Sequence, residues 1–238
     1  MSNGSRPFLS FGGGVNSVAL GLWLIDHGIE AEWVYADHGA DWPETREYVA
    51  MLQAKGYPIT VLETRRGGLA LYDYYWQYSM IPSRVARACT RLYKLVPLSE
   101  YMEPPCDVYI GIDAGESYRV ERLIEGQRPG EEKLFPLVDH GIDRAGCTEI
   151  IKAHGLPVPI KSGCYVCPFQ RVGQVRELRT LHKDLFERAL MLERRANAAR
   201  PGRGPYYLVA DKPLDAVAMD DQPDLWGERD MTPCLCEI

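Results

Sequence analysis

The chain has 238 residues, of which 46% are hydrophobic and 25% are charged, and its formal net charge is −6. This balance is typical of a globular protein with one sizeable core, and it offers no general positive charge for nucleic acid. No apolar run reaches the length that crosses a membrane, and the N-terminus does not resemble a signal peptide. We therefore expect a cytoplasmic protein without membrane contact, in an oligomeric state that composition leaves open.

Residues 7–20 predict an apolar strand, a glycine turn and then a helix that begins near Val15. The stretch is neither a Walker loop, because it lacks the Gly-Lys-Ser/Thr ending, nor a Gly-x-Gly-x-x-Gly dinucleotide motif. Successive glycines before a helix N-terminus can hold phosphate or sulfate, although a tight turn that uses glycine only for backbone freedom is equally compatible. The anion-binding set that we expect is Ser10, Gly12, Gly13, Gly14, Asn16 and Ser17.

Strands and helices alternate along the next part of the chain, which predicts an α/β fold with a parallel sheet flanked by helices. The expected strands cover residues 31–36, 59–62 and 107–111, and the expected helices cover about 43–55 and 143–154. Residues 170 to about 200 are charged and predicted to be helical. We therefore expect an α/β domain over residues 1–168, with a helical extension and a cysteine-containing tail, residues 169–238, packed on the same domain.

Parallel sheets bind ligands beyond the carboxyl ends of their strands, so polar residues that follow a strand are candidates for the site. Asp37 and Gly39 follow the second expected strand, and Glu116, Arg119 and Arg122 follow the fourth. We expect Asp37, Gly39 and Glu116 to contact the ligand. The two arginines are expected to face the same crevice, where their charge suits an anion.

Three further features have a structural role in their simplest interpretation. Asp41 can cap the helix that begins near Pro43. Residues 69–80 hold four tyrosines and a tryptophan, for which we favour a packed helix or lid over a platform that stacks bases. The basic cluster around Cys89, residues 84–94, is in the simplest case a solvated surface.

Seven cysteines suggest metal or redox chemistry in a reducing compartment, because the count is odd and the spacing is uneven. Cys164 and Cys167 form a Cys-x-x-Cys pair followed by Pro168, which can bind zinc or an iron–sulfur cluster, cycle between thiol and disulfide, or be structural. A four-thiolate site needs two more ligands, and Cys89 with a tail cysteine are the candidates. We favour a cluster over zinc. Cys147 is expected to be a small buried hydrophobe inside a helix.

Taken together, five stretches resemble the phosphoadenylyl-sulfate/adenylyl-sulfate reductase family, and the glycine turn resembles the PP-loop of the adenine nucleotide alpha-hydrolase superfamily. The matching stretches run in family order between residues 8 and 168 and lie at residues 10–17, 37–45, 89–98, 111–119 and 136–167. The resemblance implies a Rossmann-like sheet, an adenylyl nucleotide with its phosphates on the glycine turn, and a [4Fe–4S] cluster in the members that bear one.

Three departures from the family pattern bear on the site residues. Asn16 stands where many superfamily members carry aspartate, and Thr90 replaces the second cysteine of the doublet in cluster-bearing reductases. Cys89 and the Cys-x-x-Cys pair carry over as cluster ligands, and Cys234 is our choice for the fourth. The tail lacks the Glu-Cys-Gly-x-His pattern that carries the catalytic cysteine of the reductases, so Cys236 is a candidate nucleophile by position only.

Two chemistries follow from this resemblance. In the first, a thiolate attacks the sulfur of an adenylylated sulfate, and a thiol donor such as thioredoxin or glutaredoxin later releases sulfite. Lys94 and Arg119 would neutralise the negative charge that develops as the bond breaks, with help from Arg87 and Arg122. In the second, an ATP pyrophosphatase-type enzyme adenylates its substrate with Mg²⁺ and delivers sulfur, as DNA phosphorothioation and tRNA thiolation proteins do, so nucleic acid becomes a partner. A third hypothesis is a non-catalytic module that binds a nucleotide or a cluster.

Overall fold

Five parallel strands form the centre of the molecule. The computed structural model describes residues 5–160, 162–209 and 211–219. The strand order is β3-β2-β1-β4-β5, and every neighbouring pair is parallel. The strands are β1 (Arg6–Phe11), β2 (Glu32–Asp37), β3 (Ile59–Glu63), β4 (Cys106–Ile110) and β5 (Glu131–Leu134). The expected α/β class with a Rossmann-like parallel sheet is confirmed, although the sequence does not predict β5, whose first three residues are charged.

Helices cover both faces of this sheet. Successive residues of a strand point to opposite faces, so Phe8 enters one apolar core and Leu9 enters the other. The Phe8 face is covered by α5 (Val96–Tyr101) and α6 (Val120–Glu125), and the Leu9 face by α1 (Val15–Asp26), α2 (Pro43–Ala54) and α8 (Arg144–Ala153). Burial on both faces explains why the inner strands are apolar almost throughout.

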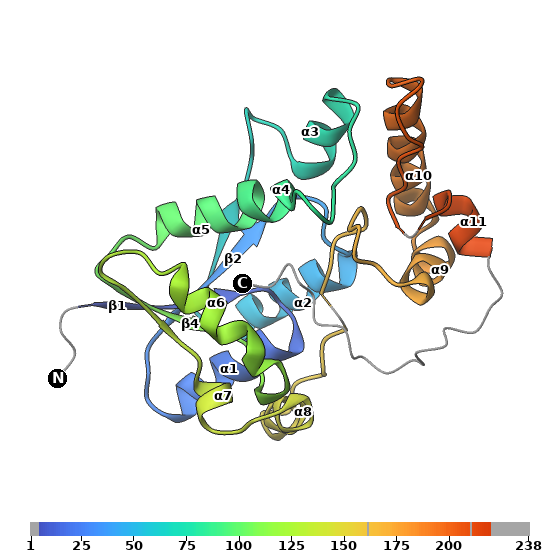
Figure 1. Cartoon of the computed structure of the whole chain (residues 1–238). Coiled ribbons are helices and arrows are strands. Elements are labelled where there is room, and N and C mark those ends of the chain that lie inside the picture. Colours follow the sequence, from blue (N-terminus) through green and yellow to red (C-terminus); the bar gives the residue numbers. More distant parts are fainter. Residues whose placement is uncertain (1–4, 161, 210, 220–238) are drawn as a thin grey trace.

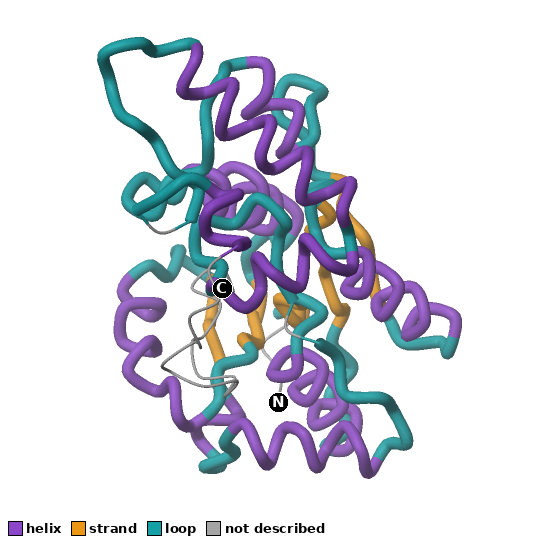
Figure 2. The backbone as a smooth tube through the Cα atoms, turned by 90° about the vertical axis from the view of Figure 1, so that its right-hand side faces the viewer, coloured by secondary structure: helices purple, strands orange, loops and turns teal. Residues whose placement is uncertain are grey.

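A third core lies beside the sheet and joins the aromatic-rich segment to the C-terminal helices. It contains α3 (Leu71–Gln77), α9 (Val172–Leu181), α10 (Lys183–Ala198) and α11 (Leu214–Met219), which stand apart from the sheet in Figures 1 and 2. Tyr72 and Tyr75 are buried in it, and the Arg188 guanidinium lies 4.2 Å from the centre of the Tyr72 ring. The expected packed helix is therefore confirmed. This core also includes Tyr165 and Val175, which lie on either side of residue 168, where we expected the α/β domain to end and the helical extension to begin.

Two stretches differ in detail from the expected helices. The charged helical stretch is interrupted between α9 and α10 at His182, whose φ of −131° and ψ of 65° are not helical. Its ring nitrogen Nε2 lies 2.7 Å from Oε1 of Glu44 at the start of α2. The basic cluster after residue 84 is partly helical, since α4 (Ala88–Thr90), a π-helical turn η1 (Arg91–Leu95) and α5 follow one another without a break.

The remaining short elements follow the last two strands. They are the 3₁₀ turn η2 (Ala114–Arg119) and α7 (Pro136–Asp139). Cys147 is fully buried in α8, as expected, and burial raises the pKa of its thiol to about 12. Along the described parts of the chain, none of the helices combines the length and the apolar composition that crossing a membrane requires.

Candidate functional site

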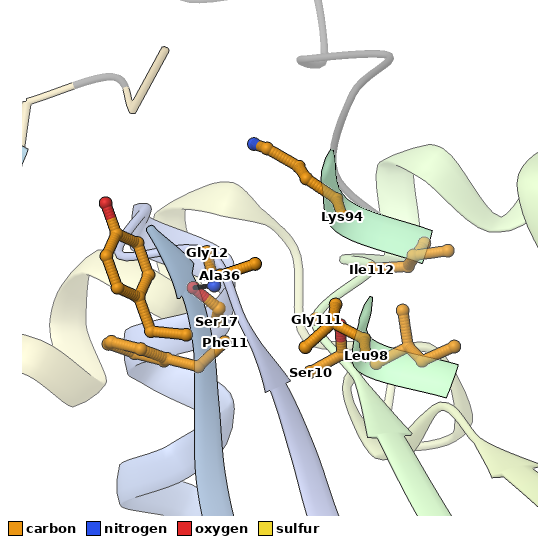
Figure 3. A pocket seen from close by; sticks show the side chains of 11 residues that line it. Ser10, Phe11, Gly12, Ser17, Ala36, Lys94, Leu98, Gly111 and Ile112 are labelled. Carbon is orange, nitrogen blue, oxygen red and sulfur yellow. Dashed lines mark hydrogen bonds between the residues drawn. The ribbon is translucent and has the colours of Figure 1, made fainter. Parts of the chain in front are cut away.

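A hollow lies where β1 and β4 end (Figure 3). Its volume is about 510 Å³ when the solvent space at its open mouth is included. We call it the strand-end hollow. The strand order reverses between these two strands, which is where open α/β sheets bind ligands. Its polar side is formed by Ser10, Gly12 and Ser17, and its apolar walls include Phe11, Leu98, Ile110 and Ile112.

The glycine turn is closed by Ser17. Its hydroxyl donates to the Gly14 carbonyl at 3.0 Å and accepts the Gly12 N–H at 3.3 Å. Gly12 lines the hollow, but Gly13 and Gly14 do not. Gly13 has a φ of +71°, and a Cβ there would lie 3.1 Å from Cγ2 of Thr45. The missing side chain of Gly13 therefore makes room for α2, whereas we expected all three glycines to leave space for a ligand.

Asn16 is not among the residues that line the strand-end hollow, and its side chain makes a buried polar contact. Its amide nitrogen donates to Oδ2 of Asp113 at 3.0 Å, and its amide oxygen accepts from Arg144 at 2.9 Å. Only 2% of Asn16 is exposed. An aspartate at this position would face the Asp113 carboxylate, which gives a physical reason for the departure from the superfamily pattern.

Three cysteines from distant parts of the chain line a second hollow of about 400 Å³, which we call the thiol hollow. They are Cys89, Cys164 and Cys167, and His38 and Thr90 line the same space. Cys89 is placed by α4, and the pair is placed by the loop before α9. The structure thus brings the three described candidate ligands to one place.

Backbone contacts shape the Cys-x-x-Cys turn. The Cys167 N–H donates to the Cys164 carbonyl at 3.0 Å, and Nε2 of Gln170 donates to the same carbonyl at 2.7 Å. The Phe169 N–H donates to the Cys167 sulfur at 3.4 Å, a contact that would stabilise negative charge on that sulfur.

The donor set of the thiol hollow suits a soft metal centre, but the arrangement is not that of a formed site. Three sulfur donors around one space fit zinc or an iron–sulfur cluster by their chemistry. Within residues 5–160, 162–209 and 211–219, however, no group of three or more His, Cys, Asp or Glu side chains is arranged to hold a metal ion. Cys234 and Cys236, the expected fourth ligand and nucleophile, lie outside the described residues.

Lys94 lines both the strand-end hollow and the thiol hollow. Figure 3 shows its side chain at the strand-end hollow. Its place in a π-helical turn is notable because such turns are frequent at functional sites. An ammonium group between the two spaces can neutralise an anion held in either of them.

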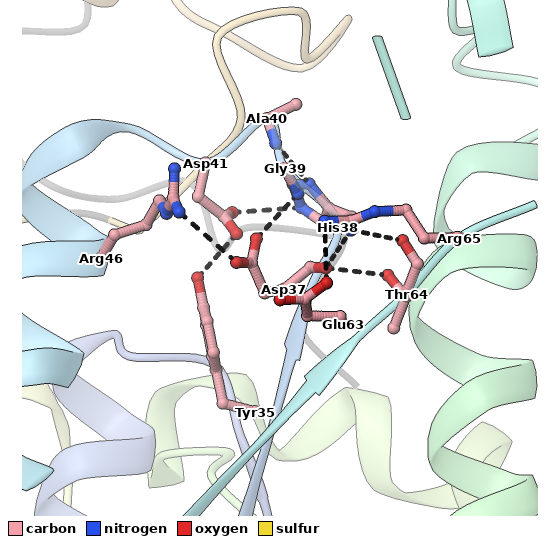
Figure 4. A network of polar contacts seen from close by, with 10 residues as sticks. All are labelled: Tyr35, Asp37, His38, Gly39, Ala40, Asp41, Arg46, Glu63, Thr64 and Arg65. Atoms are coloured by element: carbon pink, nitrogen blue, oxygen red, sulfur yellow. Dashed lines mark hydrogen bonds and ion pairs between the residues drawn. The ribbon is translucent and has the colours of Figure 1, made fainter. Parts of the chain in front are cut away.

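The loop after β2 is held by Asp37 (Figure 4). Its Oδ1 accepts the Gly39 N–H at 2.8 Å, and its Oδ2 lies 3.6 Å from the Arg46 guanidinium. Gly39 has a φ of +77°, which explains glycine there. Neither residue is among those that line the two hollows, so both shape the loop rather than border the ligand space.

Asp41 is the centre of a buried polar network (Figure 4). Its carboxylate accepts the Tyr35 hydroxyl at 2.7 Å and lies 3.1 Å from Nε2 of His38. Burial by itself would raise the pKa of Asp41, but the His38 ring, the Lys94 charge and the Tyr35 hydroxyl outweigh it and bring the pKa to about 2. Burial and the Asp41 charge raise the pKa of Tyr35, so its hydroxyl keeps the proton.

Asp41 does not have the capping role that we expected. Helix α2 begins after Trp42 with Pro43 in its first turn, as predicted, but without a side-chain cap. The carboxylate prefers the buried Tyr35 hydroxyl and the His38 ring, whose positions depend on the fold. The sequence signal that could have indicated this role is an aspartate three residues after a histidine at a strand end.

The two arginines expected beyond β4 do not line either hollow. Arg119 forms an ion pair with Glu116 within η2, and both side chains are largely buried. Arg122 is exposed on α6. In the segment before Cys89, the Arg87 guanidinium lies 5.9 Å from the centre of the Phe169 ring. The catalytic role of Arg119 and the ligand contact of Glu116 therefore stay predictions.

Comparison with known proteins adds little to this geometry. No family model matches the chain. A curated relative is an uncharacterized protein of Methanocaldococcus jannaschii, which is 25% identical over an alignment that covers 75% of this chain. The alignment covers 45% of the relative, so the chain spans less than half of that protein's length. Because the relative is uncharacterized, the similarity assigns no activity.

Proposed function

We propose that this protein is an adenylyl-nucleotide enzyme of the phosphoadenylyl-sulfate/adenylyl-sulfate reductase type. The observation that carries the proposal is that Lys94 borders both a hollow at the strand-order reversal and a hollow lined by three cysteines. A nucleotide whose phosphates lie at Gly12 and the start of α1 would direct its terminal group toward Lys94 and the thiols. Apolar walls and a polar turn in the strand-end hollow suit a base and a phosphate chain.

The proposed reaction has two steps. A cysteine thiolate forms a bond to the sulfate sulfur, the bond between that sulfur and the bridging oxygen breaks, and the adenosine phosphate leaves with the electron pair. A thiol donor of the thioredoxin or glutaredoxin type then attacks the cysteine sulfur, which forms a disulfide and releases sulfite. Lys94 stabilises the charge on the leaving phosphate. The nucleophile in this proposal is Cys236, and free thiols of this kind suit a reducing cytoplasm.

A substitution of Lys94 tests this role. Lys94→Met keeps the length of the side chain and removes its charge, so we expect a loss of about 10²-fold in kcat/KM for sulfite formation. Lys152→Met removes an exposed charge that pairs with Glu149 at 3.0 Å, and it should leave the rate unchanged. Equal rates for the two variants would contradict the role of Lys94.

An iron–sulfur cluster held by Cys89, Cys164, Cys167 and Cys234 is part of the proposal. Such a cluster would supply redox-active, polarisable iron next to the substrate sulfate. We expect brown colour and a visible absorption shoulder in anaerobically purified protein, which Cys164→Ser or Cys167→Ser abolishes. Cys147→Ala, which changes a cysteine in the core of α8, should retain the colour. A colourless protein with stoichiometric zinc would reject the cluster.

One observation favours the second candidate, an ATP-dependent sulfurtransferase that acts on a nucleic acid. Thr90 lines the thiol hollow beside Cys89, at the position where the cluster-bearing reductases carry their second cysteine. A hydroxyl there leaves only three thiols in the described hollow, which is compatible with a centre that keeps one position for an incoming sulfur.

The choice between these candidates rests on the products. Anaerobically purified protein is incubated with adenylyl-sulfate, phosphoadenylyl-sulfate or ATP, in the presence of a thiol donor and Mg²⁺. Sulfite without pyrophosphate supports the reductase, and pyrophosphate without sulfite supports the sulfurtransferase. If neither forms while the nucleotide binds, the protein is a binding module and both enzyme proposals fail.

A further inference from the structure

Asp41 connects the two hollows through its side chain. Tyr35, whose hydroxyl donates to Asp41 at 2.7 Å, lines the strand-end hollow. His38, whose Nε2 lies 3.1 Å from the other carboxylate oxygen, lines the thiol hollow. One carboxylate, on a side chain that is 4% exposed, therefore holds a wall residue of each space.

The hydrogen-bond pattern fixes the tautomer of His38. The Ala40 N–H donates to Nδ1 of His38 at 3.1 Å, so this nitrogen is an acceptor without a proton. Nε2 therefore carries the proton and donates it to Asp41. The network is complete only while Asp41 offers two acceptor oxygens, one to the imidazole and one to the Tyr35 hydroxyl.

The backbone of the same residue holds the cysteine loop. Asp41 and Cys164 form an antiparallel β-bridge. On either side of it the Trp42 N–H donates to the Gly163 carbonyl at 3.0 Å, and the Tyr165 N–H donates to the Ala40 carbonyl at 3.0 Å. A displacement of Cys164 thus acts directly on the backbone that carries the Asp41 carboxylate.

We propose that Asp41 is a positioning residue that couples ligand binding in the strand-end hollow to the reactivity of the cysteines in the thiol hollow. The proposal rests on the proposed function in one respect, that the strand-end hollow binds an adenine nucleotide. A nucleotide that contacts Tyr35 shifts the Tyr35–Asp41 hydrogen bond, and the bridge to Cys164 passes this shift to the thiols. Such coupling is reciprocal for binding, so a change at the thiols also alters nucleotide affinity.

The test measures thiol reactivity with and without nucleotide. The full chain is treated with a chelator under anaerobic conditions so that no metal shields the thiols, and it is then labelled with iodoacetamide. The labelling rates of Cys89, Cys164 and Cys167 are followed by mass spectrometry. AMP and ATP are the probes, and calorimetry gives their affinity in each variant. In the wild type we expect saturating nucleotide to change the labelling rates at least fivefold, the lower end of typical coupling energies.

Two substitutions break the connection in different ways. Asp41→Asn keeps the shape and removes the charge, and Tyr35→Phe removes only the hydroxyl that donates to Asp41. In both variants we expect nucleotide to bind and to change the labelling rates less than twofold. The Tyr35→Phe variant keeps the test valid if Asp41→Asn does not fold, because the aromatic wall stays in place.

The chain offers a matched control in a second aspartate–histidine pair. Oδ2 of Asp26 lies 3.1 Å from Nε2 of His154 at the other end of α1, with both side chains partly exposed. Asp26→Asn should behave as the wild type in binding and in labelling. A purely structural role of Asp41 would lower stability without abolishing the nucleotide effect.

The outcomes separate the two proposals. If neither AMP nor ATP binds to the wild type, the proposed function fails. If nucleotide binds but leaves the wild-type labelling rates unchanged, the coupling is overturned while the nucleotide site stands. The coupling is also overturned if Asp41→Asn and Tyr35→Phe show the same fivefold change as the wild type.

Discussion

At the scale of single residues, the buried hydrogen-bond partners near the glycine turn determine which side chain can occupy position 16. Asn16 has both a donor and an acceptor group, and it uses the donor toward Asp113 and the acceptor toward Arg144. Asp113 in turn accepts the Gly115 N–H at 2.9 Å. A side chain of the same shape but of different hydrogen-bonding character cannot replace Asn16 without loss.

The Asn16→Asp substitution should therefore destabilise the protein. It places two carboxylates in a buried contact that is 3.0 Å long in the wild type, and we expect a loss of about 2–4 kcal/mol in the free energy of unfolding at pH 7. Urea unfolding measures this loss. The double variant Asn16→Asp with Asp113→Asn restores one donor and one acceptor, so it should recover most of the stability. A double variant no more stable than the single one would contradict this account.

At the scale of elements, the chain just after β4 lies close to the first turn of α1, and residues of both line the strand-end hollow. A Cβ on Gly111 would lie 2.8 Å from the Ser17 nitrogen and 3.0 Å from the Asn16 carbonyl carbon, both of them backbone atoms. Backbone cannot move aside as the end of a flexible side chain can. Gly111 therefore has a packing reason to be glycine, independent of any ligand.

Gly111→Ala should push α1 away from β4. We expect a loss of about 1–3 kcal/mol in stability and a nucleotide affinity at least tenfold weaker, because Gly12 and Ser17 move with the turn. Thermal unfolding and calorimetric titration with AMP measure the two effects. Gly126→Ala is the control, since its Cβ would meet atoms no closer than 3.7 Å. Wild-type affinity in Gly111→Ala would show that the helix position does not matter for binding.

At the scale of the whole molecule, the C-terminal helices are joined to the rest by a core that includes α3 and the cysteine loop. A buried carboxylate supports this layer, because Glu193 of α10 accepts the Leu208 N–H at 2.7 Å and the Leu214 N–H at 2.9 Å. Burial nonetheless raises the pKa of Glu193 above 4.5, and the two N–H groups oppose that rise only in part.

This shift predicts a pH dependence of global stability. The folded state favours the protonated form of Glu193 more than the unfolded state does. The resulting contribution of Glu193 to the free energy of unfolding is therefore fully present below pH 4.5, and it is lost as the pH rises through the pKa of the folded state. We expect the difference in unfolding free energy between the wild type and Glu193→Gln to decrease from pH 4 upward in urea titrations. A difference that grows with pH would contradict the raised pKa.

Local patterns were sufficient for much of the fold and for naming several of the residues that line the two hollows. The apolar strands of the sheet centre, the glycine turn and the helix after Pro43 all follow from short-range periodicity and turn chemistry. The burial of Cys147 and the packing of the aromatic segment follow in the same way. Strand β5 does not, because its charged edge residues are stabilised by pairing with β4 rather than by their own pattern.

The order of residues along the chain was enough to predict the α/β class, the edge of the sheet where the candidate site lies, and the chemical types of residue at that edge. Which of these residues meet became clear only in the folded chain. Cys89 and Cys164 share one hollow, Lys94 borders two, and Asp41 holds Tyr35 and His38 rather than capping a helix. The reason is physical: a buried polar group takes the partner that folding brings within 3 Å or so, and spacing along the chain does not contain that distance.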